Sequence, residues 1–202
     1  MADLLQGLTL ALLLAPFSHQ QHLKLGLECA SCHKGALSSA RPADNNLPTQ
    51  EVCRSCHEQP VAIKQPSPNL VTRFSHLQHL KLGNFAAVIA AAIDGKTYHT
   101  LPAETVHKHL NTNNACGACH RGLEGSTQVS KANMPQMADC LVCHPKIDNP
   151  FSCEFCHDPG PHLKPASHVP GYLDFHSTGR ANLDKQSCVI CHGKRFTCLG
   201  CH

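Results

Sequence analysis

The sequence predicts a mostly irregular fold with short α-helices. Aromatic residues make up 4% of the 202 residues and tryptophan is absent, so a large core of side chains is not expected. The 13 glycines and 14 prolines disfavour long helices and strands. All 14 cysteines fall into Cys-x-x-Cys-His motifs, which is the most informative observation. The fold is therefore expected to be organised around these motifs rather than as packed layers of helices and sheets.

Each motif has the residues that attach one c-type haem, because two thiols can bond to its vinyl groups while the adjoining histidine binds its iron. The cysteines predicted to bind haem are Cys29, Cys32, Cys53, Cys56, Cys116, Cys119, Cys140, Cys143, Cys153, Cys156, Cys188, Cys191, Cys198 and Cys201. The histidines predicted as the first iron ligands are His33, His57, His120, His144, His157, His192 and His202. The chain is thus predicted to be a multihaem cytochrome c with seven haem c groups. With about 29 residues per haem, the haems are expected to form much of the core.

Other uses of the cysteines explain the pattern less well. Seven disulfides, or zinc sites built from Cys-x-x-Cys pairs, do not require a histidine after every second cysteine. A thioredoxin-like motif needs one pair beside a βαβ pattern, which is not visible here. The net charge of +3 describes the bare polypeptide, and no run of Lys or Arg follows one helix face, so no nucleic-acid partner is predicted. Lys34 and Lys194, next to motifs, are expected to offset haem propionates.

An internal repeat divides the chain. Residues 17–26 and 74–83 are identical except that Leu77 replaces Gln20. Cys-x-x-Cys-His-Lys/Arg-Gly follows at 29–35 and 116–122, and Asn-Leu-Pro at 46–48 matches Asn-Met-Pro at 133–135. The predicted domains are an N-terminal apolar segment, 1–16; a two-haem module with its linker, 17–73; a second two-haem module, 74–149, with an insertion at 84–115; and a three-haem module, 150–202.

The start of the first module resembles a known family. Phe17-x-His19-x-x-His22, with Cys29 seven residues after the second histidine, is similar to the opening of the class III cytochromes c, small periplasmic electron carriers with three or four haems. The resemblance implies that His19 is the second ligand of the nearest haem, and that His22 reaches a neighbour, such as the haem of Cys53. It implies the same roles for His76 and His79 in the second module, and export for covalent haem attachment.

The remaining histidines can be counted against the haems. Seven haems need seven second ligands, and the other ten histidines are His19, His22, His76, His79, His99, His107, His109, His162, His168 and His176. The first module has two for two haems and the last unit three for three, whereas the second module has five for two. Its excess of three, His99, His107 and His109, lies in the insertion. His109 stands seven residues before Cys116, as His22 does before Cys29, so it could displace His79. The predicted second ligands are His19, His22, His76, His79, His109, His162, His168 and His176.

Methionine ligation would raise the reduction potential, but Met134 and Met137, the only methionines beyond the first residue, are expected to pack against a porphyrin. Ligation by two histidines throughout therefore predicts low reduction potentials. An enzyme would need a haem with an open axial position. Enough histidines are present to fill every position, and no Cys-x-x-Cys-Lys motif of the multihaem nitrite reductases occurs. No catalytic residue is therefore predicted, and a haem reductase with one open site is the least favoured alternative.

Two apolar segments remain. Leu4 to Pro16 is too short to span a bilayer and is expected to be a signal remnant or an arm that packs on the protein. Asn84 to Gly95 predicts a short helix with Asn84 as N-cap and Gly95 as C-cap. Because this helix is apolar on every face, it is expected either among the haems or at a subunit interface. Thr97 to Leu110 predicts a second helix, beginning near Pro102.

These observations predict an exported, low-potential carrier that passes electrons through bis-histidine haems between a redox protein donor and acceptor, in the periplasm or outside the cell. A carrier with such low reduction potentials would suit the reducing end of a respiratory chain, such as that of anaerobic respiration. The alternative is a subunit of an assembled electron conduit, a homo-oligomer or filament whose haems continue across interfaces. No transmembrane span is predicted.

Overall fold

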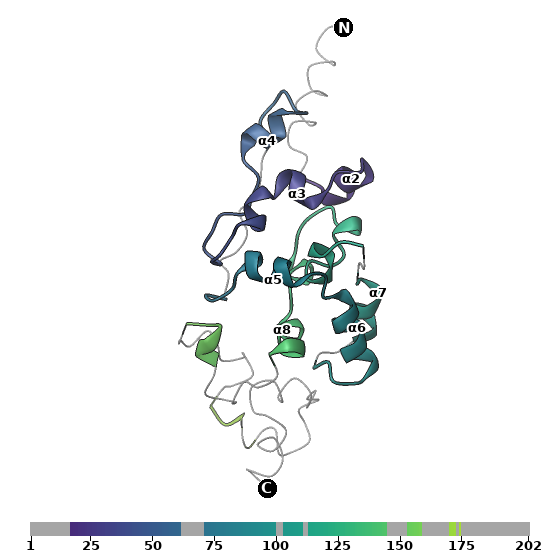
Figure 1. The fold of residues 1–202 in the computed structure, drawn as a ribbon, viewed down its shortest axis with the longest axis vertical. Helices are drawn as coiled ribbons and strands as arrows, with labels where there is room; N and C mark the ends of the chain where they lie inside the picture. Colours follow the sequence, from purple (N-terminus) through teal and green to yellow (C-terminus); the bar gives the residue numbers. More distant parts are fainter. Residues whose placement is uncertain are drawn as a thin grey trace. The chain divides into compact units, whose positions relative to one another are not determined.

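The computed structural model describes residues 17–61, 71–99, 103–110, 113–144, 153–158, 170–172 and 174. Within these ranges the chain forms short helices and irregular loops, without a β-strand. The α-helices are α2 (His19–Lys24), α3 (Cys29–Cys32), α4 (Gln50–Arg54), α5 (His76–Leu82), α6 (Ala86–Asp94), α7 (Ala103–Lys108) and α8 (Met137–Cys143). The 3-10 helices are η2 (Lys34–Leu37), η3 (Cys116–Ala118), η4 (Leu123–Gly125), η5 (Lys131–Asn133) and η6 (Cys153–Phe155). Figure 1 shows these turns of helix between long loops, and the predicted fold class is confirmed.

The repeat of the sequence is also a repeat of local structure. Ser18 and Ser75 each precede a helix that carries two histidines, α2 and α5, and the serine Oγ accepts a hydrogen bond from the backbone N–H of Gln21 or Gln78. Such N-caps satisfy a donor that the first helical turn leaves unpaired. Gly83 follows α5 with a φ of 99°, in the left-handed region that favours glycine, which explains why the helix ends there.

Few hydrophobic side chains are buried in the described part of the chain. They are Ala86, Ile89, Tyr98, Ala118 and Ala138. Large apolar side chains next to the helices are exposed to solvent instead: Leu25 is 76% exposed and Leu82 is 75% exposed. Each follows the second histidine of its repeat by three residues. Surfaces of this kind are consistent with the prediction that haems, rather than side chains, fill the centre of the molecule.

The chain separates into two compact units, which are described one at a time. Unit 1 takes its residues from Met1–Asn69, Ser75–Ala86 and His109–Pro135, and unit 2 from Leu70–Phe74, Ala87–Lys108 and Gln136–His202. In unit 1, the backbone N–H of Gln20 donates to the carbonyl of Ser126 over 3.0 Å, which ties α2 to the end of η4. The buried Ser39 carbonyl accepts from the Leu77 N–H at 2.9 Å and from the Ser75 hydroxyl at 3.3 Å, which anchors the start of α5.

Unit 2 joins the insertion to a haem motif. The buried Tyr98 hydroxyl donates to the buried Asp139 carboxylate over 2.7 Å. The same carboxylate accepts from the Gln136 N–H at 2.7 Å and so caps α8, the helix that carries Cys140 and Cys143. A second link runs from the Thr72 N–H to the Cys156 carbonyl at 2.8 Å. The insertion therefore supports the helix that presents the fourth motif.

Both helices predicted in the insertion are present. α6 begins at Ala86, two residues after the predicted cap, and the Asn84 Oδ1 accepts from the Ala86 N–H over 2.9 Å. α6 is buried on one side only, since Ile89 is 2% exposed and Val88 is 46% exposed. α7 occupies the centre of the second predicted helix.

Several predictions concern residues outside the described part of the chain. They are the N-terminal apolar segment, most of the linker between Gln59 and Pro68, and, in the last module, His162, His168, His176, Cys188, Cys191, His192, Cys198, Cys201 and His202.

Candidate haem-binding sites

The first four motifs share one backbone hydrogen bond. In each, the N–H of the histidine donates to the carbonyl of the first cysteine, over 2.8 Å for His33, 2.9 Å for His57, 2.8 Å for His120 and 2.9 Å for His144. Residues three and four apart on a helical turn lie on the same face. Both sulfurs and the imidazole of each motif are therefore presented on one side of the turn, as a single planar group would require. The cysteines of the first four motifs, and Cys156 of the fifth, form no disulfide.

Three histidine pairs face each other within unit 1. The ring centroids of His19 and His33 lie 6.2 Å apart, with 12° between the ring planes. His76 and His120 repeat this arrangement in the second module, at 6.4 Å and 14°. The third pair is formed by His22 and His57, at 6.0 Å and 45°. Each pair joins a motif histidine to one from α2 or α5.

The separation of these rings fits a metal bound between them. A bond from an imidazole nitrogen to a first-row metal is about 2 Å long, so two imidazoles on opposite sides of one iron have centroids about 6 Å apart. The residues of unit 1 therefore fit three bis-histidine haems.

Hydrogen bonds to backbone carbonyls fix which ring nitrogen of His33 and His120 can bind a metal. Nδ1 of His33 lies 2.8 Å from the Asn46 carbonyl, and Nδ1 of His120 lies 3.2 Å from the Asn133 carbonyl. Because a carbonyl oxygen only accepts hydrogen bonds, Nδ1 must carry the proton, which leaves the lone pair on Nε2 for a metal.

The second histidine of α2 and of α5 follows the same rule. Nδ1 of His22 donates to the Ser18 carbonyl and Nδ1 of His79 to the Ser75 carbonyl, each over 2.8 Å. Sequence reasoning identified the histidines and missed these acceptors, which are backbone atoms. The available signal was the repeat itself, because Asn46 and Asn133 both follow their motif histidine by 13 residues.

Burial keeps several of these rings neutral. Burial, followed by the nearby His33, lowers the pKa of His19. Burial and then His120 lower the pKa of His76, and burial is also the main cause that lowers the pKa of His120. A histidine must be neutral to bind a metal, so these shifts favour ligation over protonation.

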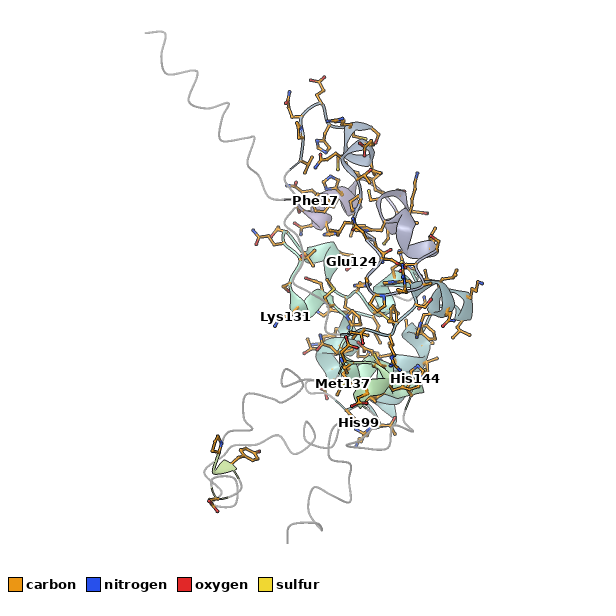
Figure 2. All side chains as sticks on the ribbon, turned by 90° about the vertical axis from the view of Figure 1, so that its left-hand side faces the viewer. Phe17, His99, Glu124, Lys131, Met137 and His144 are labelled. Carbon is orange, nitrogen blue, oxygen red and sulfur yellow. The ribbon has the colours of Figure 1, made fainter. Side chains whose placement is uncertain are left out.

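Phe17 contacts both histidines of α2. Its ring meets His19 edge-on, with centroids 4.8 Å apart, and stacks on His22 at 4.6 Å. Figure 2 labels Phe17, which stands at the start of the described chain just before α2. Contacts from one aromatic side chain, Phe17, thus help to set the orientation of both histidines.

The histidines of the insertion are placed differently. His107 and His109 are exposed, and Nε2 of His107 lies 3.7 Å from the Asp94 carboxylate at the end of α6. Among the other motif residues, His144 ends α8, as Figure 2 shows, while Cys153 begins η6 and Cys156 and His157 follow it.

Comparison with known proteins agrees with this geometry. The family model for cytochrome c7 and related cytochrome c matches residues 15–76, the part that holds Phe17, α2 and the first two motifs. This segment is similar to multihaem c-type cytochromes. No curated protein and no solved structure matches the chain. The match supports covalently bound haem c and electron transport as the chemistry of this protein. Among the described helices, none has the length and apolar character needed to cross a membrane.

Proposed function

We propose that this protein transfers electrons through seven covalently attached c-type haems, each held by two histidines. The observation that carries the proposal is the set of three histidine pairs, 6.0 to 6.4 Å apart, beside complete Cys-x-x-Cys-His motifs. The haems are numbered in the order of their motifs. The first is assigned His33 and His19, the second His57 and His22, and the third His120 and His76.

The remaining assignments extend this pattern. By the repeat, the fourth haem takes His144 and His79. The last three motifs take His157, His192 and His202 as first ligands, with His162, His168 and His176 as second ligands. For the modules and the linker we propose the same boundaries that the sequence predicts.

The bound haems supply one-electron chemistry, with iron alternating between the ferric and ferrous states. The chain's own residues determine how that chemistry is used. The cysteine pair of each motif would hold one haem, and its two assigned histidines would both bind the iron, so that no ligand position would be left for a substrate. Nitrogen ligands on both sides hold the potentials low compared with histidine and methionine ligation. These features support an exported electron carrier, working between a donor and an acceptor redox protein, over an enzyme.

The first prediction tests the number and ligation of the haems. The intact mass of the purified protein should exceed that of the polypeptide by seven haems, because all seven motifs are complete. Magnetic circular dichroism of the oxidised protein should then show low-spin iron only. A mass with fewer haems would mean that some motifs are idle, and a high-spin signal at neutral pH would indicate an open axial site and favour a reductase.

The assembled conduit is the second candidate, and one observation favours it. α6 exposes Ala87, Val88 and Ala91, which are all apolar, on the side opposite Ile89. Exposed apolar surface on a helix is a common feature of interfaces, although a patch this small also occurs on monomers. The carrier is the primary proposal, and the size of the native particle separates the two.

A pair of adjacent substitutions makes this test specific. Val88→Glu should leave the particle size and haem content unchanged, because the side chain is 46% exposed. Ile89→Glu buries a charge and removes packing, and should lower the free energy of unfolding by about 3 kcal/mol or more. Light scattering and denaturant unfolding measure the two effects. A smaller particle for Val88→Glu, with all haems kept, would favour the conduit.

A further inference from the structure

Two haem motifs that are far apart in the sequence meet inside unit 1. The side-chain amide of Asn114 donates from Nδ2 to the Cys29 Sγ over 3.3 Å. Its Oδ1 accepts from the Cys116 N–H over 2.8 Å. The bond to Cys116 is a local turn contact of a common kind. The bond to Cys29 spans 85 residues and has no local explanation, so one amide connects the first motif to the third.

The sulfurs of these motifs are themselves in contact. The Cys29 and Cys116 thiols share a hydrogen bond. Together with the two bonds of Asn114, this contact places the first and third motifs side by side. Haems attached at Cys29 and Cys116 would therefore be neighbours.

The first haem also adjoins the second. Phe17 contacts His19, assigned to the first haem, and His22, assigned to the second. Cys32, the other sulfur of the first motif, lies near Cys53 and Cys56 of the second motif. Cys29 and Cys32 therefore face different neighbours.

We infer that the first haem is the junction of unit 1, so that electrons cross it in the order second, first, third, and that Asn114 is a positioning residue for the contact between the first and third haems. This inference rests on the proposed function. One electron moves between neighbouring irons at each step, and one iron is oxidised as the next is reduced, without any bond made or broken. The path differs from the order of the motifs along the chain.

Asn114→Asp on the full haem-loaded protein tests the role of the amide. Aspartate keeps the acceptor for the Cys116 N–H and loses the donor to Cys29, so the local turn is preserved while the link is removed. Asn113→Asp adds the same charge one residue earlier and serves as the matched control. The readout is the magnetic coupling between haems in the electron paramagnetic resonance spectrum of the oxidised protein, together with the rate of electron exchange.

With haem count and low-spin state unchanged, Asn114→Asp should weaken one coupling and slow exchange several-fold, whereas Asn113→Asp should match the parent protein. Equal spectra for the two variants would overturn the role of Asn114. A residue that merely supports the fold would lower stability without changing the coupling, so denaturant unfolding is measured in parallel.

Two ligand variants test the junction. Replacing His19 creates a rapidly relaxing high-spin first haem, which should broaden the signals of two other low-spin haems. Replacing His22 creates a high-spin second haem, which should broaden the signal of one other low-spin haem. Broadening of two signals by His22→Ala, or of one by His19→Ala, would overturn the order. Failure of the proposed function is distinguishable, because it would appear as high-spin or missing haem in the parent protein.

Discussion

Replacing His19 by alanine should convert one haem per molecule from low-spin to high-spin iron and create one site that binds carbon monoxide. His19 faces His33 across 6.2 Å, and its Nδ1 is buried without a hydrogen-bond partner. Removing the imidazole leaves His33, held by the Asn46 carbonyl, as the one protein ligand of that haem. Magnetic circular dichroism and carbon monoxide titration measure the change.

The matched control is His107→Ala, which removes an exposed histidine beside Asp94 rather than beside a motif. It should leave every haem low-spin and bind no carbon monoxide. If His19→Ala also stays fully low-spin, another residue ligates the first haem and the assignment of the pair is wrong. A high-spin haem in the control would show that the insertion supplies ligands.

Replacing His79 should also create one high-spin haem, whereas replacing His109 should not. The sequence leaves both histidines open, because His109 has the same spacing to Cys116 that His22 has to Cys29. The local structure favours His79. Its Nδ1 donates to the Ser75 carbonyl as that of His22 donates to the Ser18 carbonyl, so the lone pair that can bind a metal is on Nε2. The ring of His79 is also partly buried, while His109 is exposed.

Spectra of the single variants His79→Ala and His109→Ala, each at full haem content, check this assignment. The opposite result, with high-spin iron in His109→Ala only, would mean that the insertion has taken over a ligand position. High-spin iron in both would mean that the two histidines serve different haems, and the repeat would then be an incomplete guide to ligation in the second module.

Short helices and the repeat could be predicted because they depend on local composition and on motifs that recur intact. The helix after Asn84 and the helix after Pro102 were both predicted from such local signals. The sides of α6 could not be predicted, since a helix that is apolar all round carries no periodicity to separate buried Ile89 from exposed Val88.

The missed contacts of the candidate site have a common physical cause. The acceptors for His33 and His120 are main-chain carbonyls, which every residue type possesses, so Asn46 and Asn133 gave no signal by identity. The contact between Asn114 and Cys29 depends on how two distant turns approach, and nothing in the spacing of either motif contains that information.

The small number of buried hydrophobic side chains has a consequence for how this protein is made. In the described part of the chain, the buried hydrophobic residues are mostly alanines, while Leu25 and Leu82 are exposed beside the helices that carry the paired histidines. Such a chain gains too little from burying its own side chains to offset the entropy of ordering them. Attachment must therefore come before folding is complete, on a polypeptide whose thiols are still reduced and accessible. Biogenesis of the mature protein is then limited by the supply of cofactor and of reductant, and chains that miss an attachment are left open to proteolysis.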